Sequence, residues 1–155
     1  MNRALEQLAA EVGLLEPGRE RMRLEFAFAC AARIRHLLEE PEVLACLSVL
    51  GQYLNGFADR MALEASQAQA LRLANSHRGS KSIDGCGHAA VSASYAVANA
   101  ISGRALQAAD YAAYASVYAD GGYGAVAQLE AFAPEFSWQA SALRSIAARH
   151  ATPPA

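Results

Sequence analysis

Three polar residues that could form a catalytic set occur at four-residue intervals: Asp84, His88 and Ser92. On a helix this spacing would place the three side chains along one face. A hydrolase triad, however, needs a nucleophile exposed at a turn and an oxyanion hole, and a serine within a helix has neighbouring backbone N–H groups that are already hydrogen-bonded. We therefore interpret Asp84 as the N-cap of a helix that runs to Ile101, and we predict that the chain is not an enzyme.

Cys86 would lie in the first turn of the same helix, where the helix dipole could lower the thiol pKa and give a reactive thiolate. The alternative, which we favour, is a small packed side chain between two glycines. The four histidines are scattered without an H-x-x-x-H or H-E-x-x-H pair, and the GSKSIDGCG loop lacks the G-K-[ST] order of a phosphate-binding loop. We expect no catalytic residue, no metal and no cofactor.

A row of tyrosines is better suited to binding than to catalysis. Three of them are spaced i, i+3, i+7, which places them on one face of a helix, and an aspartate stands on either side of the row. The row could be core, because aromatic stripes are commonly buried. It could instead be a surface that binds another protein, because tyrosine offers a large, rigid contact area with a polar tip. The predicted partner-binding residues are Asp110, Tyr111, Tyr114, Tyr118, Asp120 and Tyr123.

These residues must be positioned by helices, because the apolar residues recur with a helical period and no alternating strand pattern is found. We predict an all-α, compact bundle of about seven or eight helices. Asn2 caps the first helix, and Pro41 opens the third. A long helix is expected from Arg19 to Glu39. Further helices are expected over 60–75, over 105–119, over 123–132 and from Pro134 onward. Ser102-Gly103 should separate the 105–119 helix from the one before it. The residues expected to face inward on the 60–75 helix are Met61, Ala65, Ala68, Leu71 and Leu73.

Length and composition limit the class of protein. The chain has 155 residues, 37 of them alanine, and a net charge of −2. One helical domain over residues 1–150 with a frayed tail at 151–155 is expected. The small negative charge argues against a nucleic-acid partner, which needs clustered basic residues. No run of 18 apolar residues and no signal peptide is found, and three widely spaced cysteines are typical of reduced thiols, so we expect a cytoplasmic protein without a membrane partner.

Three segments resemble the immunity proteins of bacterial polymorphic toxin systems: RMRLEFAFACAARIRHLLEE, GHAAVSASYAVANAISGRAL and DYAAYASVYADGGYG. The resemblance lies in an A-C-A-x-R-[IV] helix followed by H-A-A and Y-A helices, and it covers about residues 21–123. It implies a small, all-helical, cytoplasmic inhibitor that binds a cognate toxin domain and blocks its active site. It carries no catalytic residue and assigns no interface position.

Two other functions stay open on the residues alone. The first is a helical ligand-binding or regulatory module with a cavity lined by Tyr95, Tyr111 and Trp138. The second, ranked last, is an enzyme that uses Asp84, His88 or Cys86. An exposed tyrosine row favours the immunity protein, whereas a closed apolar pocket favours the ligand-binding module.

Overall fold

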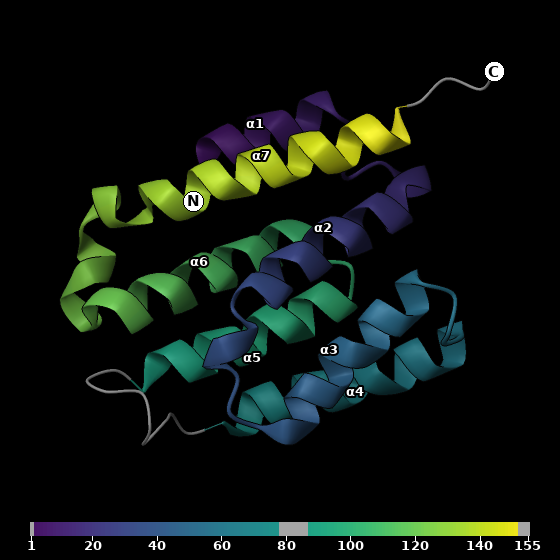
Figure 1. The fold of residues 1–155 in the computed structure, drawn as a ribbon, viewed down its shortest axis with the longest axis horizontal. Coiled ribbons are helices and arrows are strands. Elements are labelled where there is room, and N and C mark those ends of the chain that lie inside the picture. The colour runs from purple at the N-terminus through teal and green to yellow at the C-terminus, as the bar shows by residue number, and fades with distance from the viewer. Residues whose placement is uncertain (1, 78–86, 152–155) are drawn as a thin grey trace.

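The computed structural model describes residues 2–77 and 87–151, apart from the side chain of Tyr123 (Figure 1). Within these residues the chain forms α-helices and short 3-10 turns and no strand, which confirms the predicted all-α bundle. The elements are α1 (Arg3–Glu11), η1 (Pro17–Arg19), α2 (Glu20–Arg33), η2 (Arg35–Leu37), α3 (Pro41–Leu54), α4 (Arg60–Ser76), α5 (His88–Ile101), α6 (Ala105–Gly121), η3 (Tyr123–Ala127), η4 (Leu129–Phe132) and α7 (Ala133–His150).

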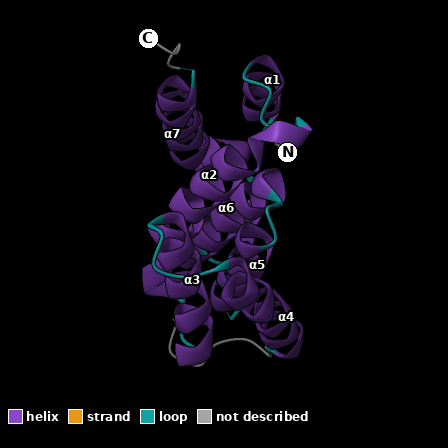
Figure 2. Ribbon diagram, turned by 90° about the vertical axis from the view of Figure 1, so that its right-hand side faces the viewer, coloured by secondary structure: helices purple, strands orange, loops and turns teal. Residues whose placement is uncertain are grey.

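The helices are arranged in tiers. Helices α1 and α7 lie side by side along one edge, α2 and α6 run through the middle, and α3 and α4 form the opposite edge (Figures 1 and 2). Helix α5 packs against α2, α3, α4 and α6, and nine of its fourteen residues are buried. Most of those nine are alanines, because small side chains let four neighbours approach one helix closely.

Helix ends follow the signals in the sequence. The Asn2 side chain accepts a hydrogen bond from the Leu5 backbone N–H at 3.1 Å, so its predicted role as an N-cap is confirmed. Gly103, with φ of 76°, ends α5 in the left-handed conformation. The Arg104 N–H then donates to the carbonyl oxygen of Asn99 at 2.9 Å, which closes the α5–α6 turn.

The second predicted helix is too long. Helix α2 ends at Arg33, six residues before Glu39. The chain continues as η2, which keeps Leu37 and Leu38 buried while the backbone changes direction. Pro41 disfavours helical geometry in Glu40, the residue directly before it, and so accounts for the start of a new helix at Pro41 and not for the end of α2 at Arg33.

The predicted inner face of α4 is wrong. Met61 is 77% exposed and Leu71 is 52% exposed, and Ala65 and Ala68 are exposed as well. Leu73 alone of the predicted set is half-buried. The buried residues of α4 are Leu63, Ala70 and Ala74. Alanine occurs on every face of this helix, so the apolar period did not distinguish the face that packs against α3 and α5.

Helix α5 begins at His88, with Gly87 in the N-cap position and no side-chain cap. Asp84, the predicted N-cap, and Cys86 lie outside the described residues, as do residues 152–155 of the predicted frayed tail. None of the helices in the described parts of the chain is long and apolar enough to cross a membrane.

Candidate partner-binding surface

The tyrosine row on α6 lies at the boundary between core and solvent. Tyr111 is 37% exposed, and Tyr114 and Tyr118 are half-buried. The opposite face of α6 carries the alanines that pack into the core. The row is therefore neither a core stripe nor a fully exposed one, and each ring has one supported side and one accessible side.

The structure divides the row into two groups. Tyr114 and Tyr118 lie 6.1 Å apart between ring centroids, and the Tyr114 ring meets Phe132 edge-on at 5.4 Å. Phe132 in turn contacts Phe136 at 5.4 Å, and Tyr118 contacts the His88 ring at 5.4 Å. We call these five residues the aromatic cluster. The i and i+4 spacing of the two phenylalanines is a signal in the sequence for this contact, and neither residue is among the predicted partner-binding residues.

Tyr111 belongs to a different place, a groove between α4, α5 and α6. Its ring stacks on that of Tyr95 with centroids 5.2 Å apart and an interplanar angle of 23°. The Tyr95 hydroxyl donates to Oδ1 of Asn75 at 2.8 Å, and the Asn99 side-chain amide donates to the Tyr95 carbonyl oxygen at 2.8 Å. The Tyr95–Tyr111 groove has a volume of about 260 Å³ and is lined by Leu71, Tyr95, Ala98, Asn99, Ser102, Arg104, Gln107 and Tyr111.

The two predicted aspartates lie on different sides of α6: Asp110, four residues before Tyr114, is on the tyrosine side of the helix, and Asp120 is not. Asp110 is half-buried, and burial raises the pKa of its carboxyl above 3.8, with the charge of Glu6 acting in the same direction. Asp120 is exposed and lies nine residues, about two and a half helical turns, beyond Tyr111, so it projects from the opposite side of α6. Tyr123 is in η3, and its side chain lies outside the description. The six predicted residues are thus spread over separate places.

Asp120 lines a second groove, of about 430 Å³, at the junction of α6, α7 and α2. Its wall contains the buried Glu135, whose two carboxylate oxygens accept from Nε of Arg33, one of them at 2.9 Å. The Arg33 guanidinium also lies 4.5 Å from the centre of the Trp138 ring. We call this the Arg33–Glu135 groove. Trp138 is therefore fixed beside Arg33, whereas the cavity considered from the sequence had placed it with Tyr95.

Cys30 lies in α2 close to this ion pair. Its thiol is buried, and burial raises the thiol pKa far above its usual value. The negative charge of Glu135 raises the pKa further, and the positive charge of Arg33 only partly opposes this. A thiol in this environment is protonated at neutral pH and is a poor nucleophile.

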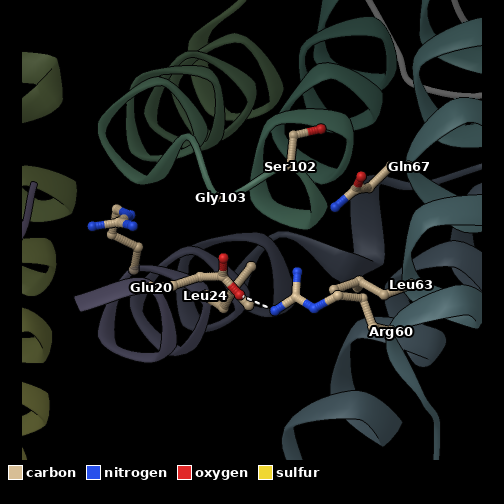
Figure 3. Close-up of a pocket in the computed structure, with 8 residues that line it drawn as sticks. Glu20, Leu24, Arg60, Leu63, Gln67, Ser102 and Gly103 are labelled. Carbon is tan, nitrogen blue, oxygen red and sulfur yellow. Dashed lines mark hydrogen bonds and ion pairs between the residues drawn. The ribbon is translucent and has the colours of Figure 1, made fainter. Parts of the chain in front are cut away.

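A third hollow, near the start of α2 and α4, is closed by its own residues (Figure 3). Glu20 accepts a hydrogen bond from the Arg60 guanidinium, which also donates to the Tyr53 hydroxyl at 2.9 Å. The hydrogen bond with Glu20, and next its charge, raise the pKa of Arg60. The hollow has a volume of about 80 Å³, and the ion pair between Glu20 and Arg60 in its wall joins α2 to α4.

The catalytic alternative finds no further support in the described residues. His88 is the first residue of α5 and lies against the Tyr118 ring, while Ser92 is half-buried one turn later. Asp84 and Cys86, its other members, are outside the described ranges. Within residues 2–77 and 87–151, no three histidine, cysteine, aspartate or glutamate side chains gather as a metal site would require.

No protein-family model, curated protein or solved structure matches this chain.

Proposed function

We propose that this protein is an immunity protein, which binds a cognate bacterial toxin domain in the cytoplasm and covers its active site without catalysing a reaction. The observation that carries the binding part is Tyr111, an exposed ring held in place by its stack on Tyr95. Rings of this kind dominate the energy of protein interfaces, since they bury a large area at a small cost in side-chain entropy.

The toxin part of the proposal comes from the sequence resemblance. The three segments that carry it form α2, α5 and α6, which pack on one another at the centre of the fold. Most of their shared pattern is therefore accounted for by packing of small residues, and the side chains left accessible are the ones available for a partner. On α6 these include Tyr111, the half-exposed rings of Tyr114 and Tyr118, and Asp120.

The test is a complex with the toxin encoded in the neighbouring reading frame. Co-expression of this chain should restore growth to cells that produce the toxin domain, and the purified pair should form a complex in which the toxin is inactive. Hydrogen–deuterium exchange should then show added protection of α6 and η3–η4. Absence of both binding and protection would refute the proposal, and protection of α1 and α7 alone would place the interface elsewhere.

A ligand-binding module is the second candidate, and the Arg33–Glu135 groove is the observation that favours it. Its volume of about 430 Å³ lies within the range of small-molecule sites, about 300–1,000 Å³, whereas the Tyr95–Tyr111 groove lies below that range. A ligand bound there would contact Arg33, whose guanidinium lies 4.5 Å from the centre of the Trp138 ring, and should change the fluorescence of Trp138. An immunity protein would show this change only with its toxin.

A further inference from the structure

The Tyr95–Tyr111 groove has the size of one side chain. Its volume of about 260 Å³ is below that of typical small-molecule sites, about 300–1,000 Å³. Interface anchors, by contrast, are single side chains that fill pockets of this kind on the partner. The size of the groove therefore suits the side chain of another protein better than a free metabolite.

The wall of the groove formed by the two tyrosine rings is already ordered. Leu71 is 52% exposed at its edge, and the stacked rings of Tyr95 and Tyr111 form its wall. The hydrogen bond from Tyr95 to Asn75 fixes the inner ring at its hydroxyl end. A pocket that is ordered before binding loses little conformational entropy when an apolar side chain enters it.

The rim carries one charge among its lining residues, that of Arg104. This arginine is exposed and makes no ion pair with another described residue, whereas Arg21, Arg33 and Arg60 each pair with a glutamate. The remaining polar residues of the rim are neutral. The groove therefore has a positive rim, although the whole chain has a net charge of −2.

We propose that the Tyr95–Tyr111 groove binds an apolar side chain of the partner protein that has a carboxylate beside it, the apolar group resting on Leu71 and the rings and the carboxylate pairing with Arg104. The proposal rests on the proposed function for its partner and extends it by defining the chemistry of one contact. The guanidinium suits a carboxylate because its planar donors match the two oxygens.

The groove can be tested without the toxin, by NMR titration with three blocked dipeptides: acetyl-Leu-Asp-amide, acetyl-Leu-Asn-amide and acetyl-Leu-Lys-amide. The aspartate peptide should shift the signals of Tyr95, Tyr111 and Arg104, and it should bind about three- to fivefold more tightly than the asparagine peptide, as is typical of an exposed ion pair. The lysine peptide should bind most weakly. At 1 M salt, where the screening length falls to about 3 Å, the preference for aspartate should be lost.

Arg104→Gln should remove the preference while leaving the weak binding of leucine intact. Arg144→Gln is the matched control, since Arg144 is an exposed arginine on α7 outside the groove. Scattered peptide shifts, equal binding of the aspartate and lysine peptides, or an unchanged preference in Arg104→Gln would each overturn the proposal.

The toxin complex separates this inference from the proposed function. If the toxin binds the parent chain and Arg104→Glu weakens that binding, both stand. If the toxin binds and Arg104→Glu has no effect, the contact at the groove is refuted while the immunity function stands. If no toxin binds, the immunity function fails, and the peptide titration alone decides the chemistry of the groove.

Discussion

Truncation of Tyr111 should weaken binding of the proposed toxin partner by about 2 kcal/mol. A tyrosine side chain offers on the order of 200 Å², and 37% exposure leaves about 75 Å² that a partner can still cover. At about 25 cal/mol per Å², burial of that area contributes about 2 kcal/mol. Tyr111→Ala should therefore raise the Kd about 30-fold.

The same substitution also acts on the fold, because it removes the stack on Tyr95. The stack contributes about 0.5–1.5 kcal/mol beyond area burial, and the roughly 125 Å² of the side chain that is already buried contributes about 3 kcal/mol at the same coefficient. We therefore expect the free energy of unfolding to fall by about 4 kcal/mol. A domain of ordinary stability, about 5–15 kcal/mol, stays folded after such a loss. Binding and folding can thus be measured on the same variant.

The assay is calorimetric titration of the toxin into each variant, with a urea transition to record stability. Tyr111→Phe should bind within about threefold of the parent chain, because the ring supplies the buried area. Phe57→Ala is the control for loss of an exposed aromatic ring, since Phe57 is 85% exposed in the turn between α3 and α4, far along the chain from α6. A folded Tyr111→Ala variant with parental affinity, or equal losses in both alanine variants, would refute the reasoning.

Four further outcomes are expected. Asn2→Ala should lower the free energy of unfolding by about 1 kcal/mol, because it removes the N-cap hydrogen bond. Asn2→Ser should be close to neutral, because serine keeps the cap and removes the buried amide Nδ2, which has no partner among the described residues. Urea transitions measure both variants. Burial raises the pKa of the Asp110 carboxyl, so the native state keeps a proton that the unfolded chain releases, and the free energy of unfolding of the parent chain falls as pH rises above the ordinary value of 3.8. Asp110→Asn should therefore stabilise the protein at pH 7 and make the free energy of unfolding less dependent on pH. Cys30 should resist thiol reagents in native buffer at pH 8 and react in denaturant, as peptide mapping would show; rapid native labelling would contradict its burial. Gly103→Ala should cost about 1–2 kcal/mol through its positive φ, whereas Gly18→Ala, with open space around the new methyl group, should cost little; thermal unfolding compares them.

Much of the local structure could be predicted from the sequence, because it depends on neighbouring residues. A side-chain acceptor three residues before a free N–H makes Asn2 a cap, and a glycine that tolerates positive φ makes Gly103 a helix end. The helical spacing of Tyr111, Tyr114 and Tyr118 likewise placed them on one side of α6. Each of these features is set by residues close together in the sequence, so none of them depends on which helices pack against one another.

The tertiary structure decided which faces meet, and there the sequence was ambiguous. In α4 the alanines lie on all sides, so the contacts with α3 and α5 selected Leu63 as inward and left Met61 outward. Tyr111 pairs with Tyr95 because α5 and α6 pack closely, although the two residues are sixteen positions apart. Arg104, in the α5–α6 turn, lines the same groove as these two tyrosines. Helix packing fixes how each helix is rotated about its own axis and how far it lies from its neighbours. The apolar period of a single sequence contains neither quantity.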